Sequence, residues 1–156
     1  MTITINKSDL VFDIKNKSHL EVASIENIDQ RYIAEAASDK EDEITRCIMD
    51  AVAKVRYMCG RFLEQDADST SSESISSSLS SDSSFSFSFT ENARRYSNRK
   101  QEIASTMHSA IVSMALSKFY ISVSQPGLAQ SHDVVAANAV ALLEKMLCEK
   151  LPPVLP

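Results

Sequence analysis

The segment from about 98 to 123 constrains the fold most strongly, because its apolar residues would lie on nearly every side of a helix. They include Met107, Ile111, Leu116 and Phe119. A helix that is apolar almost all round is buried on several sides. The chain has only two glycines in 156 residues, and so few glycines favour long helices over a turn-rich sandwich. We therefore expect a helical bundle in which this segment is the central helix.

Two further long segments are predicted to be helices beside it. Ser38 and Glu41 form a capping-box pattern, in which the serine hydroxyl and the glutamate side chain each bond an amide at the helix start. The apolar residues that follow recur every 3.6 positions, which predicts an amphipathic helix from 39 to about 64. The last helix is expected to begin with Ser131 as its N-cap and to end near residue 150. Helical spacing predicts that its inner side comprises Val135, Ala139, Leu142, Leu143, Met146 and Leu147.

The N-terminal part predicts shorter elements. Residues Thr2 to Asn6 alternate between polar and apolar side chains, which is typical of a strand, but five residues are too few for a strand that is stable alone. Ser8 is expected to cap a short helix that ends near Lys15. Over 18–37 the apolar spacing predicts helical pieces joined by an irregular section.

A serine-rich block follows the helix at 39–64. Thirteen of the twenty residues from Ser69 to Ser88 are serine, yet Ile75 and Leu79 interrupt the run. The three phenylalanines Phe85, Phe87 and Phe89 then alternate with serine.

A period of two places the three rings on one face of a strand, which a flexible tether would not need. We interpret the block as a β-hairpin, with 72–79 pairing with 85–90, its Phe face against the helices and its Ser face toward solvent or a neighbouring subunit. The alternative is a disordered insert with an apolar end.

These elements predict a mainly α protein of one domain, a bundle of about four helices with an inserted β-hairpin. The helical core would comprise about 8–64 and 97–150, and the Ser-rich insert about 66–91. The tail 151–156, LPPVLP, contains three prolines and is expected to be extended because proline cannot continue a helix.

The charge pattern argues against binding of nucleic acid over the whole surface. The net charge is −5, whereas contacts to phosphates need an excess of lysine and arginine. One local contrast exists: the segment 64–91 is acidic, and Arg94, Arg95, Arg99 and Lys100 follow it. These two segments could meet head to tail between subunits, or the basic group could be a solvated face.

No residue pattern predicts an enzyme, a cofactor site or a metal site. The histidines His19, His108 and His132 lie in three different segments without ligand spacing. Two glycines cannot form a glycine-rich phosphate loop, and the sequence has no G-x-S-x-G nucleophile elbow.

Nor do the cysteines indicate a disulfide or a catalytic thiol. Cys47 and Cys59 would lie ~18 Å apart on one helix, at ~1.5 Å per residue, too far for a disulfide. With Cys148 the count is odd, so a reducing compartment is expected. No signal peptide and no apolar run of ~18 residues is present, which predicts no transmembrane helix.

The order of the segments resembles the head–tail connector (adaptor) proteins of long-tailed phages and prophages. The helix at 39–64 ends with AVAKVRYMCGRFL, Ala51 to Leu63, which includes an aromatic-x-x-Gly-Arg phrase. A later segment, EIASTMHSAIVSMALSKFY from Glu102 to Tyr120, is similar to the long apolar helix with a terminal aromatic pair in that family. The opening INKSDLVFDI, Ile5 to Ile14, is similar to the starts of related neck proteins. The Ser-rich insert and the Pro-rich end depart from the family pattern.

This resemblance implies a virion structural protein, located in the neck and assembled in the cytoplasm of a bacterial host. About a dozen copies would form a closed ring between the portal protein and the tail, and DNA would pass through it without sequence-specific binding. The strand at 2–6 and the tail at 152–156 would become ordered on a neighbouring subunit or on the portal. The expected subunit and portal interface comprises Arg94, Arg95, Arg99, Lys100, Phe85, Phe87, Phe89, Pro152 and Pro153.

Two alternatives remain open from the sequence. The chain could be another phage tail-completion or assembly protein with similar helices. It could also be a small cytoplasmic helical module that binds a partner. Neither alternative predicts catalysis.

Overall fold

The computed structural model describes residues 1–64, 84–90 and 99–148. The fold is mainly α with a small antiparallel sheet, as the sequence predicts. The elements in chain order are β1 (Thr2–Asn6), α1 (Lys7–Val22), α2 (Ile28–Ala34), the 3₁₀ turn η1 (Ser38–Lys40), α3 (Glu41–Met58), the 3₁₀ turn η2 (Gly60–Phe62), β2 (Ser84–Ser88), α5 (Lys100–Ser122) and α6 (Pro126–Cys148).

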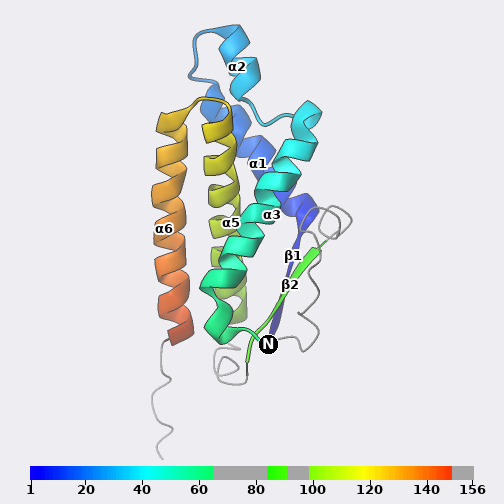
Figure 1. Cartoon of the computed structure of the whole chain (residues 1–156), viewed down its shortest axis with the longest axis vertical. Coiled ribbons are helices and arrows are strands. Elements are labelled where there is room, and N and C mark those ends of the chain that lie inside the picture. The colour runs from blue at the N-terminus through cyan, green and yellow to red at the C-terminus, as the bar shows by residue number, and fades with distance from the viewer. Residues whose placement is uncertain (65–83, 91–98, 149–156) are drawn as a thin grey trace, which may run out of the picture.

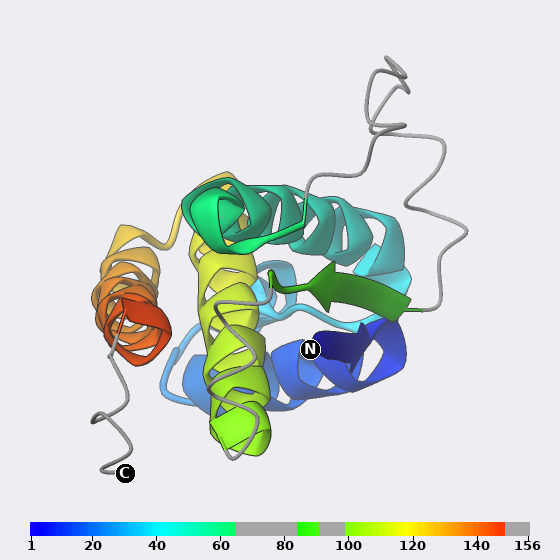
Figure 2. The same cartoon turned by 90° about the horizontal axis from the view of Figure 1, so that it is seen from below.

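Helix α5 is the centre of the molecule, and the prediction of its burial is confirmed. Seen from below, it lies between α6 on one side and the strands on the other, with α3 and α1 on the remaining sides (Figure 2). Residues on several faces of this helix are buried, among them Met107, Ile111, Leu116 and Tyr120. The wide apolar circumference of this segment is therefore the reason that the other elements surround it.

Helix α6 runs alongside α5 for its whole length (Figure 1) and starts earlier than predicted. A tight turn with Ser124 at φ 60° and a bond from the Gln125 amide to the Tyr120 carbonyl reverses the chain. Pro126 is then the first helical residue, where its fixed φ fits and its missing N–H costs nothing. Ser131 is therefore not the N-cap; it lies inside the helix, and its hydroxyl donates to the Gly127 carbonyl.

The capping box predicted at Ser38 and Glu41 is wrong. Lys15 of α1 donates to the Ser38 hydroxyl at 3.3 Å and to the Glu41 carboxylate at 3.0 Å, so both side chains are used for a contact between elements. Helix α3 also ends at Met58, and the chain continues into η2 instead of remaining helical to 64. The apolar stripe itself is confirmed, because residues such as Ile48 and Val52 are buried.

The first helix is longer than predicted and the irregular section after it is shorter. Helix α1 begins at Lys7 after the extended Asn6, so Ser8 is not its cap, and it continues to Val22. The break around Asn27 is confirmed: its side chain accepts bonds from the first amides of α2 and caps that helix. At the other end of α2, Lys40 donates to the carbonyls of Tyr32, Ile33 and Glu35.

Strands β1 and β2 form an antiparallel sheet in which Ile3 pairs with Phe87 and Ile5 with Phe85. All three Phe rings are buried, so the prediction of an inward Phe face is confirmed. Strand β2 pairs with β1, which was not predicted. The expected partner at 72–79 lies outside the described residues, so that pairing stays a prediction. Segment 2–6 is therefore ordered within its own subunit, because β2 supplies the hydrogen bonds and the apolar face that it lacks alone.

Candidate assembly surface

The residues predicted to form an interface have different positions in the structure. Arg99 and Lys100 are exposed at the start of α5. The predicted residues at 94, 95, 152 and 153 lie outside the described part of the chain. Phe85, Phe87 and Phe89 are at most 1% exposed, so they stabilise the subunit, and their assignment to an interface is wrong.

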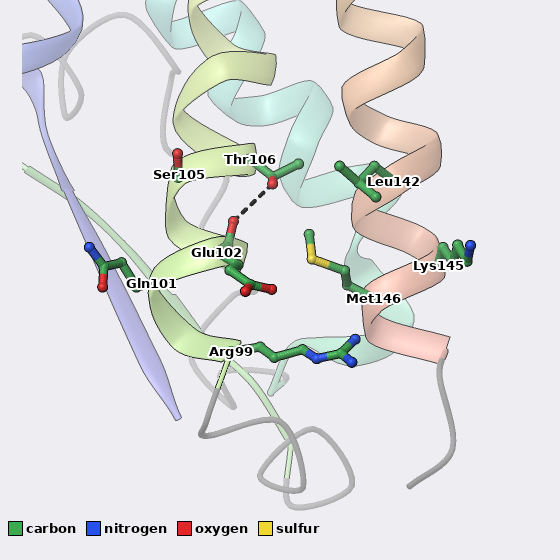
Figure 3. Close-up of a pocket in the computed structure, with 8 residues that line it drawn as sticks. All are labelled: Arg99, Gln101, Glu102, Ser105, Thr106, Leu142, Lys145 and Met146. Atoms are coloured by element: carbon green, nitrogen blue, oxygen red, sulfur yellow. Dashed lines mark hydrogen bonds between the residues drawn. The ribbon is translucent and has the colours of Figure 1, made fainter.

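Arg99 lines an open groove between the start of α5 and the end of α6, with a volume of about 710 Å³. Figure 3 shows the Arg99 side chain reaching across toward α6, where Met146 and Lys145 lie, while Glu102 and Thr106 form the wall on α5. The Thr106 hydroxyl is fixed by a bond to the Glu102 carbonyl at 2.8 Å. The lining is therefore mixed, with two cationic side chains, the Glu102 carboxylate and the partly apolar Met146 and Leu142.

Leu142, which is 50% exposed, connects this groove to the outer face of α6. Helix α6 packs chiefly against α5, so much of its circumference faces solvent. Val134 is 56% and Val135 49% exposed, and no charged residue occurs between Asp133 and Glu144. We name this exposed, uncharged surface at 134–142 the α6 face; a helix face of this kind is typical of a contact surface.

A polar network inside the bundle joins α1, α5 and α6. The Glu21 carboxylate of α1 accepts from the Tyr120 hydroxyl at 3.0 Å and contacts His132 Nε2 at 2.8 Å. The His132 ring also stacks on the Tyr120 ring, with centroids 5.7 Å apart. His108 contacts Asp13 and His19 contacts Glu35 in the same way. Sequence spacing gave no sign of these pairs, because each joins residues from separate elements.

The network sets the pKa of Glu21. Burial raises this pKa, but the hydrogen bonds and charge of His132 and the hydrogen bond from Tyr120 outweigh that effect, so the pKa lies below its usual value of 4.5. A carboxyl whose pKa is lowered in the folded state contributes stability above its unfolded pKa, and the contribution disappears as the pH falls through the folded value. Glu21 therefore stabilises the fold at neutral pH and not in acid.

We expect Glu21→Gln to lower the free energy of unfolding by roughly 1–3 kcal/mol at pH 7, the value of hydrogen bonds to a charged group. The difference from the wild type should shrink as the pH falls from the ordinary pKa of 4.5 through the lower pKa of the folded state. Urea unfolding at a series of pH values measures this. Glu26→Gln, an exposed change nearby, is the control and should cost little at any pH. A constant difference between Glu21→Gln and the wild type would contradict the assignment.

The three cysteines are free and differ in exposure. Burial raises the pKa of the Cys59 thiol to about 11, and the charge of Glu144 adds to this effect. Burial also raises the pKa of Cys47. Cys148 is exposed, and Arg61 lies 3.1 Å from its sulfur. The two buried thiols are therefore protonated at neutral pH, and their packing explains their place on the inner side of α3 and η2.

A thiol reagent is therefore expected to modify one cysteine of the folded chain rapidly and all three after denaturation. The released chromophore of a disulfide reagent, followed at pH 8, gives the count. Cys148→Ser should remove the fast phase, and Cys47→Ser should leave it unchanged. Rapid modification of Cys59 in the folded chain would contradict the burial of this side chain.

Within the described ranges, no group of three or more His, Cys, Asp and Glu side chains is placed to hold a metal ion. None of the helices described is both long enough and apolar enough to cross a membrane. No family model, curated protein or solved structure matches this chain.

Proposed function

We propose that this protein is a head–tail connector (adaptor) of a long-tailed phage or prophage, a structural ring subunit between portal and tail. The resemblance of the ordered segments supports this proposal. The phrase ending in Gly60 and Arg61 lies at the junction of α3 and η2, and the segment from Glu102 to Tyr120 lies within the central helix α5. The second segment thus forms the centre of the bundle, whereas Tyr57, Gly60 and Arg61 of the first are exposed at the end of α3.

The α6 face is the observation that carries the proposal. A closed ring needs two different surfaces on each subunit, one for each neighbour. The α6 face offers apolar area without charge on one side of the bundle, and the adjoining groove offers Arg99 and Lys145. Subunits that associated through this surface would remove Val134, Val135 and Leu142 from water, at about 25 cal/mol for each Å² of apolar area.

The end of the molecule at α2 fits an axial contact with the portal or the tail. Figure 1 shows α2 at one end of the long axis of the bundle. Ile28 and Tyr32 are 76% and 63% exposed, and Ile33 is 55% exposed. Large apolar side chains gathered at an end mark an interaction site more often than scattered ones do. The net charge of −5 suits a channel that DNA passes through without binding.

Sedimentation velocity of the purified chain tests the proposal, with negative-stain electron microscopy of the same sample. A closed ring of about a dozen subunits is expected, formed alone or after addition of the portal protein of the same phage or prophage. A chain that remains a monomer in both samples would contradict the proposal and favour the partner-binding module. If the genes on either side of the one that encodes this chain do not encode portal, capsid and tail proteins, the phage assignment would be contradicted.

A further inference from the structure

The two edges of the β1–β2 sheet differ, and the backbone pattern shows how. The Phe89 amide donates to the Met1 carbonyl at 2.8 Å. Hydrogen-bonded and non-hydrogen-bonded pairs alternate along an antiparallel ladder. The register therefore makes Ile3–Phe87 and Ile5–Phe85 hydrogen-bonded pairs, whereas Thr2 and Thr4 direct their N–H and C=O groups away from β2.

On the outer side of β2, other parts of the chain bind the corresponding backbone groups. Arg56 of α3 donates to the Ser86 carbonyl at 3.0 Å, and its guanidinium lies 4.7 Å from the centre of the Phe87 ring. The Glu64 amide donates to the Ser88 carbonyl at 2.8 Å, and the Thr90 amide donates to the Phe62 carbonyl at 2.9 Å. This edge is therefore covered.

On the outer side of β1, no backbone partner of Thr2 or Thr4 exists among the described residues. We name this side the open edge. Soluble proteins usually protect such an edge with lysine, proline, a bulge or a very short strand. The strand sequence TITIN has no charged or proline residue, and its five residues limit the length of the ladder. An edge of this kind is a template for a short further strand.

A groove of about 270 Å³ lies beside the open edge, between β1 and the first turns of α5. The strand and the start of α1 line it with Thr4, Ile5, Asn6 and Asp9, and α5 lines it with Gln101, Ala104, Ser105 and His108. Figure 3 shows Gln101 and Ser105 on the side of α5 that faces away from α6. The groove has room for a few side chains of a docked strand, and most of its lining is small or uncharged.

We propose that the open edge binds the serine-rich segment of a second copy of this chain and thereby extends the sheet from subunit to subunit. Residues 74–81, SISSSLSS, are uncharged. Ile75 and Leu79 are an even number of positions apart, so in an extended strand both side chains would lie on the same face and could enter the groove. Serines on the other face would meet Thr2 and Thr4, as Ser88 and Ser86 already do at 3.3 and 3.4 Å on the β2 side.

A second copy is the better source of this segment than the same chain. The segment precedes β2 directly in the sequence. To reach the outer side of β1 within one subunit, its connection to β2 would have to cross over the end of β1, and such crossings are avoided. The inference deepens the proposed ring by naming one contact between neighbours, and it rests on that proposal for closure of the assembly.

The deciding variant is Thr4→Pro, which removes the outward N–H and leaves the β1–β2 hydrogen bonds, because proline is tolerated on an edge strand. Thr4→Val keeps the N–H and is the matched control. Sedimentation should show self-association weakened at least tenfold by Thr4→Pro and unchanged by Thr4→Val. Circular dichroism checks the fold, and Thr2→Pro, at the other outward position, replaces Thr4→Pro if that variant does not fold.

A mixing experiment identifies the source of the strand. Ile75→Asp with Leu79→Asp should prevent a subunit from giving its serine-rich strand to a neighbour, and it leaves the open edge intact. Thr4→Pro should only prevent a subunit from binding a neighbour's strand at its open edge. At a concentration at which the α6 face alone does not hold subunits together, each variant alone is expected to sediment as a monomer, and an equimolar mixture should form pairs and no larger species. A mixture that remains monomeric would overturn the proposal.

The remaining outcomes separate this inference from the proposed function. Rings that form equally well with Thr4→Pro would overturn the strand contact and leave the connector. Assemblies that are sensitive to Thr4→Pro but never close would support the strand contact and contradict the connector. A wild-type chain that is monomeric at all concentrations would overturn the strand contact, and a ring formed only on the portal would then still support the connector.

Discussion

Replacement of Phe87 by alanine is expected to lower the free energy of unfolding by about 3–5 kcal/mol, the cost of truncating a large core side chain. The ring is fully buried, pairs with Ile3 across the sheet and lies under the Arg56 guanidinium. Urea unfolding followed by circular dichroism gives the value.

Ser86→Ala is the control for this variant. Ser86 is the preceding residue on β2 but is exposed on the opposite face, so its loss should change the free energy of unfolding by less than about 0.5 kcal/mol. Equal stabilities of Phe87→Ala and Ser86→Ala would show that β2 does not belong to the core. The serine-rich block would then be a tether up to its last residues.

If the chain forms the proposed ring, Val135→Glu combined with Leu142→Glu is expected to leave it as single subunits. Both side chains are about half exposed on the α6 face, so the subunit should keep its helices. In an assembly through this face the new carboxylates would lose water without a partner, which costs several kcal/mol for each contact. Sedimentation velocity would detect the change as a fall in mass of about twelvefold.

Gln130→Glu adds a charge to the same helix outside the α6 face and is the matched control. It should assemble as the wild type does. If the double variant also assembles normally, the α6 face is not a subunit contact. Failure of both variants would instead indicate a general effect of negative charge on α6.

The central helix was predictable because a helix that is buried on all sides needs apolar residues around its whole circumference, and this pattern is visible in the local sequence. The predicted range 98–123 differs from α5, Lys100–Ser122, by two residues or fewer at each end. Helix boundaries that depend on tertiary contacts were less accurate. Lys15 binds the side chains of Ser38 and Glu41, which would otherwise form the capping box. The turn at Ser124 allows Pro126 to be the first residue of α6.

Strand pairing could not be derived from the sequence. The alternation at 2–6 and at 85–89 predicted two strands with one apolar face each, and both faces are buried. Which strands pair depends on how the helices fold the chain, and a local pattern carries no information on that. The prediction chose the segment nearest in sequence, at 72–79, whereas β2 pairs with β1.

The candidate interface was predictable only in part. Charge placed Arg99 correctly on the surface, and it lines the groove at the end of α6. The α6 face was missed, because Val135 and Leu142 were assigned to the inner side by helical spacing. The apolar residues of α6 cover more than one side, so spacing alone did not determine which side meets α5.

The pairing of β1 with β2 also affects how the chain is made. Thr2 and Ser88 are 86 positions apart, and a ribosome adds about 5–20 residues each second. Roughly 4–17 s therefore pass between the synthesis of the two strands, during which Ile3 and Ile5 have no partner strand. Helices α1 and α3 can form in that interval from local contacts. Although β1 is synthesised before β2, it can therefore reach its native pairing only after residue 88 has been added to the chain.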